Sequence, residues 1–156
     1  AWDPRPLKAT GITYCTSAMG GDHTAGLVID PKSSGEKAAI ASQEIQIVNA
    51  ICDSTGFCMF LGPTVEETAK FLTPFFGEEV SRETVADIGW ECLQDEWLFN
   101  EKAGMTLADD VMADCMSSEG IGPEHGMKFD IPEEIVRMAK VRQPPSEKFW
   151  RKSPAG

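Results

Sequence analysis

Three residues in the segment ICDSTGFCMF (51–60) have types and spacing that could do chemistry together. Asp53 is followed three positions later by Gly56 and five positions later by Cys58, inside an otherwise apolar run. A helix end followed by a glycine turn presents backbone N–H groups and a carboxylate to a ligand, and a thiolate binds soft metals such as iron clusters. The competing interpretation is that a helix ends at Asp53, turns at Gly56, and buries Phe57 and Cys58.

A second candidate is His23 in the segment SAMGGDHTAG (17–26), where it follows Gly20 and Gly21. Glycines let the backbone approach another group closely, and an imidazole on such a loop can give or take a proton near neutral pH. His23 is therefore a candidate catalytic residue. The competing interpretation is that Asp22 and His23 form a surface turn.

The sequence favours neither a functional role for His125 nor a hydrolase. His125, in GPEHGMK, has no comparable surroundings and is expected to be a loop residue. A Cys–His hydrolase built from Cys58 and His23 would need an activated thiol, but no nucleophile elbow surrounds Cys58 and an apolar environment raises a thiol pKa.

The chain has five cysteines, at positions 15, 52, 58, 92 and 115. An odd number in a chain of this apolar content argues against a disulfide framework. We expect Cys15, Cys92 and Cys115 to be small buried hydrophobes. No C-x-x-C pair is present, so the chain alone lacks a complete zinc or iron–sulfur ligand set, and a cluster at Cys58 would need ligands from elsewhere.

Charge and hydropathy restrict the class of protein. With 14 Lys and Arg against 25 Asp and Glu, the 156 residues carry a net charge of −11, which argues against a nucleic-acid partner. No apolar stretch approaches the roughly 20 residues that span a bilayer, and the N-terminus lacks the order of a signal peptide, so we expect no membrane association and a cytoplasmic protein. The chain begins at Ala1 without an initiator Met, and we expect a piece of a longer protein.

The periodicity predicts a mostly α, multihelical domain. Helices are expected at 10–18, 36–52, 65–76, 81–104, 106–117 and 132–140. A capping box of Thr64 and Glu67 begins the third helix and Gly77 ends it, with a break expected near Pro74. Nothing alternates with period two, so no strand is expected. The length of the chain predicts one domain, 1–156, with a loop-rich start (1–36), a helical core (36–117) and a tail with a short helix (118–156).

The helix expected at 81–104 is the longest. Val85, Ile88, Cys92 and Phe99 are expected to line one face of it. On another stripe, Trp90 and Trp97 lie one heptad apart, which indicates a packing contact rather than a ligand platform.

Three stretches together resemble the aldehyde ferredoxin oxidoreductases, a family of tungsten-pterin enzymes. DPRPLKATGITYCTSAMGGDH (3–23) resembles the family's Gly-x-x-Tyr-x-Thr-Ser-x-x-Gly-x-x-His segment, and DSTGFC (53–58) resembles its second Asp-x-x-Gly-Leu-Cys pterin motif. FNEKAGMTLADD (99–110) resembles its Phe-Asn-x-x-x-Gly-x-x-x-x-Asp-Asp segment. The chain departs from the family pattern at Phe57, which replaces Leu, and at Asp22.

The resemblance implies the last of three domains, a helical one, in an enzyme that oxidises aldehydes to carboxylic acids. It implies tungsten (or molybdenum) held by two pterins, beside a 4Fe-4S cluster that passes electrons to ferredoxin. Carried over by residue, Cys58 is the fourth cluster ligand and Asp53 hydrogen-bonds a pterin. Gly56 and Phe57 line the pterin through their backbone, and His23 lies near the metal.

Two alternatives remain open within the resemblance. The chain could be a cofactor-free helical interaction module of the same fold, or part of a related tungstoenzyme acting on another substrate such as an aromatic thioester. The upstream domains, which would hold the other cluster cysteines and the first pterin motif, are the expected partners, together with ferredoxin and a small aldehyde. Without those domains this chain alone is expected to be inactive.

Overall fold

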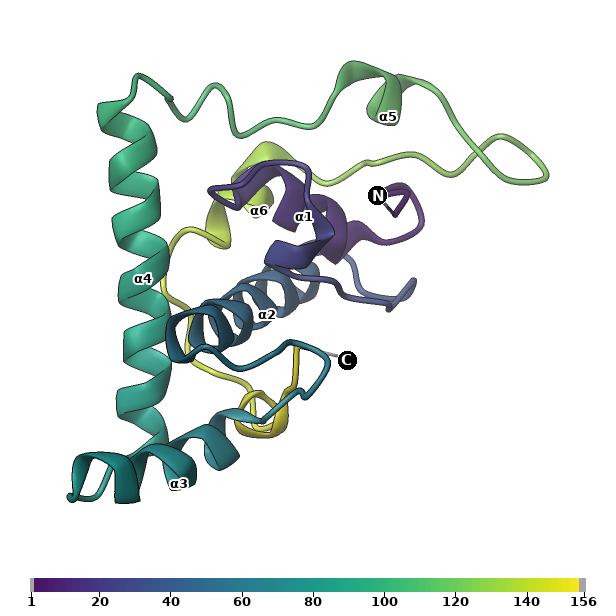
Figure 1. The fold of residues 1–156 in the computed structure, drawn as a ribbon. Helices are drawn as coiled ribbons and strands as arrows, with labels where there is room; N and C mark the ends of the chain where they lie inside the picture. The colour runs from purple at the N-terminus through teal and green to yellow at the C-terminus, as the bar shows by residue number, and fades with distance from the viewer. Residues whose placement is uncertain (1, 155–156) are drawn as a thin grey trace.

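A computed structural model describes residues 2–154 of the chain (Figure 1). Residues 1, 155 and 156, the ends of the expected 1–156 domain, lie outside the described residues. The elements are α1 (Lys8–Thr16), η1 (His23–Ala25), α2 (Gly35–Thr55), α3 (Val65–Phe76), α4 (Arg82–Lys102), α5 (Asp114–Ser118), α6 (Glu133–Met138) and η2 (Phe149–Arg151), where η denotes a short 3-10 turn. No strand occurs in this part of the chain, which confirms the mostly α, multihelical class.

Helix α2 lies at the centre of the molecule, with α1 and α6 on one side, α4 crossing it, and α3 below it, packed on α4 (Figure 1). Every residue from 42 to 52 is buried. Two polar side chains in this stretch bond to the tail: the Gln43 amide donates to the Val141 carbonyl at 2.7 Å, and the Ser146 N–H donates to the Glu44 carboxylate at 2.7 Å. Such bonds offset the cost of burying these two polar groups in a central helix.

Helix α4 crosses α2 closely at Gly89. A Cβ added to Gly89 would lie 2.7 Å from the Ile47 carbonyl oxygen, so only glycine fits at the crossing. Trp90 packs edge to face on Trp97 with ring centroids 5.5 Å apart, which confirms the predicted packing contact.

The predicted face of α4 is wrong in part. Val85 is buried, but Ile88 is 39% exposed and Phe99 is 71% exposed. The face that meets α2 carries smaller residues and one Trp, namely Val85, Ala86, Gly89, Trp90 and Leu93. Close approach of the two helices selects small side chains at the crossing, and that requirement outweighs apolar spacing.

Helix α3 confirms the predicted capping box and glycine stop. The Glu67 N–H donates to the Thr64 hydroxyl at 3.2 Å, and the Thr64 N–H donates to the Glu67 carboxylate at 2.9 Å. Gly77 has a φ of 74° and its N–H donates to the Thr73 carbonyl. The break expected near Pro74 does not occur, because Pro74 lies in the last turn, where it removes only one intrahelical donor.

The helix expected at 106–117 is reduced to the five residues of α5. The Thr106 N–H and hydroxyl both donate to the Asp109 carboxylate, at 2.7 and 3.0 Å, and form a turn instead of a first helical turn. The chain then extends away from the helices and returns through a single bridge between Ile121 and Met127 (Figure 1).

Of the three cysteines expected to be buried, only one is. Cys15 is buried in the cluster around α1, whereas Cys92 is half-buried on α4. Cys115 is exposed because it lies on α5, in the segment that extends from the helices. All five cysteines are free thiols, in agreement with the argument against a disulfide framework.

The C-terminal tail packs into the same core as the helices. Phe149 is 1% exposed and belongs to the hydrophobic cluster of α2, α3 and α4. The Arg82 guanidinium lies 4.4 Å from the ring centre of Trp150, and Lys152 pairs with the buried Glu44 at 3.0 Å.

Of the helices within residues 2–154, none combines the length and apolar character that a membrane crossing requires.

Candidate functional site

The segment from Asp53 to Cys58 forms the C-terminal end of α2 and the turn after it. Gly56 has a φ of 74°, a left-handed conformation that favours glycine, and ends the helix. The Gly56 N–H donates to the Asp53 carbonyl at 3.4 Å and the Phe57 N–H to the Cys52 carbonyl at 3.0 Å. Both N–H groups close the helix, so neither is free to donate to a ligand, and the side chains with ligand chemistry at the turn are the Asp53 carboxylate and the Cys58 thiol.

Both of these groups face solvent. Asp53 and Cys58 are exposed, so Cys58 is not the core residue of the competing interpretation. Phe57 is half-buried and packs edge to face on Phe71 of α3, with ring centroids 5.0 Å apart. The Leu61 N–H donates to the Cys58 carbonyl at 2.9 Å, which fixes the backbone that carries the thiol.

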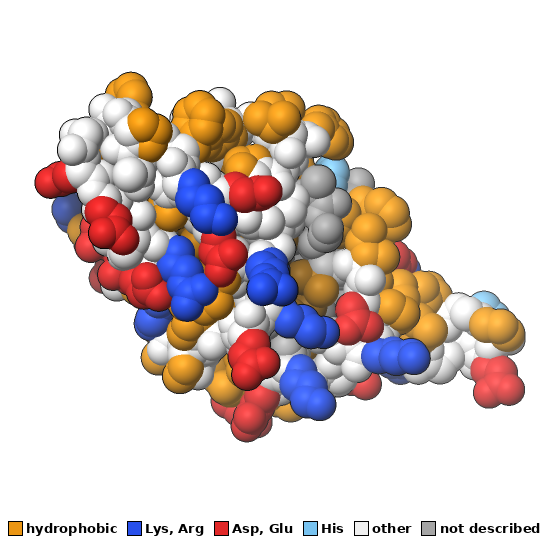
Figure 2. Space-filling model, turned by 90° about the horizontal axis from the view of Figure 1, so that it is seen from below, with side chains coloured by type: hydrophobic (Ala, Val, Ile, Leu, Met, Phe, Trp, Pro, Cys, Tyr) orange, Lys and Arg blue, Asp and Glu red, His pale blue; other side chains and the backbone are white. Residues whose placement is uncertain are grey.

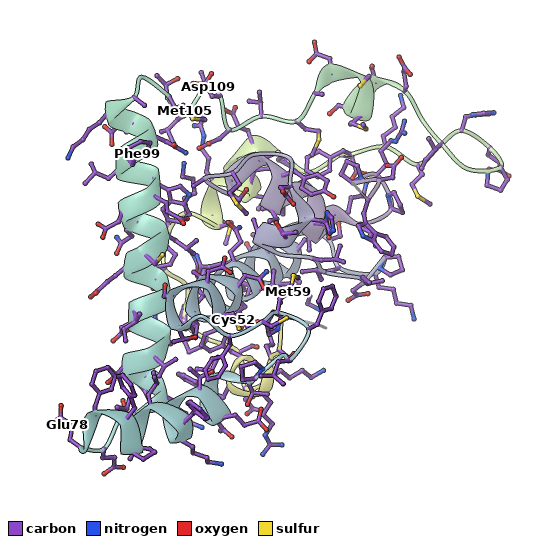
Figure 3. The ribbon with its side chains drawn as sticks, in the orientation of Figure 1. Cys52, Met59, Glu78, Phe99, Met105 and Asp109 are labelled. Atoms are coloured by element: carbon purple, nitrogen blue, oxygen red, sulfur yellow. The ribbon has the colours of Figure 1, made fainter. Side chains whose placement is uncertain are left out.

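The neighbouring thiol, Cys52, differs chemically from Cys58. Cys52 is 1% exposed in the last turn of α2, and Figure 3 labels it together with Met59, which lies just beyond the turn. Burial, together with the nearby charges of Asp53 and Cys58, raises the pKa of Cys52 to about 11. A neutral, buried thiol is a poor metal ligand, so Cys58 is the candidate ligand of this pair.

Exposed apolar side chains lie at and beside the turn. Phe60 is 85% exposed and Leu61 is 71% exposed, and Phe71 of α3, which packs on Phe57, is 63% exposed. Figure 2 shows hydrophobic side chains gathered along the upper edge of the face seen from below. An exposed apolar patch of this kind is typical of a surface that binds another protein or domain.

Glu96 on α4 interacts electrostatically with Asp53, a link that the sequence did not indicate. Burial raises the pKa of Glu96, and the nearby charge of Asp53 raises it further. The Cys92 thiol donates to the Glu96 carboxylate, with 4.0 Å between Sγ and Oε1. The i, i+4 spacing of Cys92 and Glu96 was the only sequence signal, and it says nothing of Asp53, which comes from another helix.

His23 lies at a distance from this turn. It begins η1, and its half-exposed imidazole lies 3.7 Å from the Asp22 carboxylate. The Thr24 N–H and hydroxyl donate to Asp22 and lower the pKa of that carboxyl group. Within residues 2–154, no hydrogen bond or ion pair joins His23 to Asp53 or Cys58.

The glycine that allows a close approach near His23 is Gly26. Nothing lies within 4 Å of a Cβ added at Gly20 or Gly21, whereas a Cβ at Gly26 would lie 2.8 Å from the Ile45 side chain. Gly26 thus fixes η1 against α2, about two helical turns before Asp53.

Residues 2–154 do not form a complete metal site by themselves. Across the described residues, no group of three or more His, Cys, Asp or Glu could hold a metal ion. A metal at Cys58 would therefore take its other ligands from outside residues 2–154.

Most of the chain matches one known protein family. A family model described as aldehyde ferredoxin oxidoreductase, domains 2 and 3, matches residues 1–141. This chain belongs to that family. The match includes α1 to α6 and every candidate site residue, and it ends before the part of the tail that contains the buried Phe149.

Curated relatives agree with the family match. The chain is 28% identical to the tungsten-containing aldehyde ferredoxin oxidoreductases of Pyrococcus furiosus and Thermococcus kodakarensis, over 91% of its own length. It spans only 26% of the length of either relative. No solved structure matches the chain significantly. Within the aldehyde ferredoxin oxidoreductase family, this chain is a helical domain of the C-terminal part.

Proposed function

We propose that this chain is the C-terminal helical domain of a tungsten-pterin enzyme that oxidises aldehydes to carboxylic acids and reduces ferredoxin. The observation that carries the proposal is the turn after α2, where a family-like motif presents an exposed carboxylate and an exposed thiol five positions apart. Membership of the family supports this choice of reaction class.

The residues at the turn fit the cofactors that the family implies. An ionised carboxylate only accepts hydrogen bonds, so Asp53 suits the N–H groups of a pterin edge. Gly56 has no heavy atom within 4 Å of where a Cβ would lie, which leaves open space at the turn. Cys58 would supply one thiolate to a 4Fe-4S cluster, whose other ligands would come from elsewhere.

Each part of the site then has a defined task. When bound, the tungsten-pterin group supplies two-electron oxidation and the cluster supplies one-electron transfer. Asp53 holds and orients the pterin, and Cys58 anchors the cluster. His23 is the candidate proton acceptor, although another part of the enzyme would have to bring the reacting carbon within its reach.

The missing part of the enzyme completes the site. The relatives are longer than this chain, which spans 26% of their length, and the exposed Phe60 and Leu61 beside Cys58 suit a surface that another domain covers. We therefore propose that upstream domains of the same enzyme cover this turn and that the chain alone is inactive.

The proposal is tested in the longer enzyme by changing Asp53. Asp53→Asn should lose most of the bound tungsten and at least tenfold in aldehyde-dependent ferredoxin reduction, because the amide loses the charge and half of the acceptor capacity. Asp114→Asn, a change at another exposed carboxylate, is the control and should keep both. Full tungsten occupancy in the Asp53 variant would contradict the assignment, and a parent enzyme without tungsten would favour the cofactor-free module.

A further inference from the structure

A hollow of about 360 Å³ lies between α4 and the segment that leads to His23. It is lined by Ala18, Met19, Asp95, Glu96, Phe99 and Asn100. Figure 3 shows Phe99 near the C-terminal end of α4. Glu96 is the one lining residue linked above to the site, through the charge of Asp53.

Two hydrogen bonds fix the walls of the hollow. The Trp97 indole N–H donates to the Thr16 carbonyl at 2.8 Å, and the Asn100 amide donates to the Ala18 carbonyl at 2.9 Å. These bonds join the segment after α1 to α4, so the hollow keeps its shape without a ligand. The Phe-Asn pair of the family-like segment thus has two tasks: Asn100 positions one wall and Phe99 is part of another.

The hollow adjoins the segment that leads to His23. Ala18 and Met19 line it, and they precede His23 by five and four positions. Glu96 also lines it, and the Asp53 charge helps to raise the pKa of that carboxyl group. A molecule in the hollow would therefore lie between α4 and the segment that carries the candidate proton acceptor.

The lining selects for an uncharged molecule with an apolar part. Met19 and Phe99 are 56% and 71% exposed, and their apolar surface is free to pack on a ligand. Asp95 and Glu96 supply negative charge, and among the described residues that line the hollow none is basic. Negative charge near a site disfavours an anion by Coulomb repulsion.

We propose that this hollow binds the apolar part of an aldehyde substrate, and that its acidic wall disfavours the carboxylate product. The inference rests on the proposed function, and it deepens that function by naming the substrate-selecting residues. An aldehyde is neutral and its product is an anion, so the same wall accepts the first and repels the second. Met19 and Phe99 determine the size of the apolar group that the enzyme prefers.

The first experiment measures chain-length preference in the longer enzyme. Hexanal and acetaldehyde are compared by kcat/KM in the parent, in Met19→Ala, in Phe99→Ala and in the control Phe76→Ala, which removes an exposed ring from α3. In the two hollow variants the hexanal to acetaldehyde ratio should fall roughly fivefold to twentyfold, because lost apolar contact weakens only the longer substrate. The control should keep the parent ratio.

The second experiment measures product inhibition. Hexanoate should inhibit Glu96→Gln roughly threefold to tenfold more strongly than it inhibits the parent, because one repulsive charge is gone. Glu91→Gln, an exposed change on the same helix, should leave the inhibition constant unchanged. A role of Glu96 in stability alone would not tighten hexanoate binding.

The outcomes separate this inference from the proposed function. A parent enzyme that oxidises both aldehydes, with an unchanged ratio in Met19→Ala and Phe99→Ala and unchanged hexanoate inhibition in Glu96→Gln, overturns the hollow as the substrate site and leaves the proposed function standing. A tungsten-loaded parent that oxidises neither aldehyde contradicts the proposed function, and the inference fails with it.

Discussion

Cys52 and Cys58 lie six positions apart in one segment, yet their surroundings give them opposite chemistry. The helix end buries the first and the glycine turn exposes the second. Because the turn also uses the N–H groups of Gly56 and Phe57, the functional groups that remain are side chains rather than backbone donors. The two side chains are therefore a hydrogen-bond acceptor, Asp53, and a thiol, Cys58. The proposed function uses the first to hold the N–H groups of a pterin and the second to bind a cluster.

At this scale we predict unequal alkylation of the thiols in the isolated chain. Cys52 has a pKa of about 11 and is buried, so at pH 8 only about 0.1% of it is thiolate, and its reaction with iodoacetamide should be at least tenfold slower than that of Cys58. Peptide mass spectrometry over time measures both rates. In denaturant the two rates should converge, and equal rates in the folded chain would show that the described burial of Cys52 is wrong.

At the scale of elements, the approach of α4 to α2 at Gly89 determines which face of α4 is buried. Gly89→Ala should lower the free energy of unfolding by about 1–3 kcal/mol, because the new methyl group would meet the Ile47 carbonyl at 2.7 Å and force the helices apart. Urea unfolding followed by circular dichroism measures the change. Glu91→Ala, at an exposed position of the same helix, should change stability by less than about 0.5 kcal/mol. A Gly89 variant as stable as the parent would mean that the crossing is looser than described.

Local chemistry in the sequence predicted the start of α3 and two helix ends, although it placed the start of α5 eight residues too early. Thr64 with Glu67 predicted the start of α3, and Gly56 and Gly77 predicted two ends, because capping depends only on neighbouring residues. The buried face of α4 was not predictable, because it depends on how close α2 comes at Gly89.

The candidate site was predicted only as far as its residues lie in one segment. Asp53 and Cys58 are close in the sequence, and family-like spacing marked them. Glu96 was missed because its link to Asp53 joins two helices, and no spacing within α4 reports it. The structure likewise places η1, which carries His23, about two helical turns from Asp53 rather than at the turn.

At the scale of the molecule, the tail connects distant parts of the chain. The Gln143 N–H donates to the Gln43 side chain, 100 residues away, and Phe149 completes the core of α2, α3 and α4. The sequence indicated a tail with one short helix but not this packing, because contacts between distant residues leave no local pattern. The family match ends at residue 141, so the fold depends on residues outside that match.

We predict that Phe149→Ala destabilises the isolated chain by about 3–5 kcal/mol, because it removes a fully buried ring and leaves a cavity. Thermal unfolding by circular dichroism measures the loss. Phe76→Ala, which removes a ring that is 60% exposed, is the matched control and should cost less than about 1 kcal/mol. If the two variants were equally stable, the tail would not be part of the core.

The central claim is that the turn after α2 faces an iron–sulfur cluster through Cys58. The measurement that tests it most directly is the iron content and visible absorbance of the longer enzyme carrying Cys58→Ser, beside Cys115→Ser at the other exposed cysteine. We predict that Cys58→Ser loses most of its cluster iron and its ferredoxin-reducing activity, whereas Cys115→Ser retains both. Parent levels of iron and unchanged absorbance in the Cys58 variant would contradict the claim.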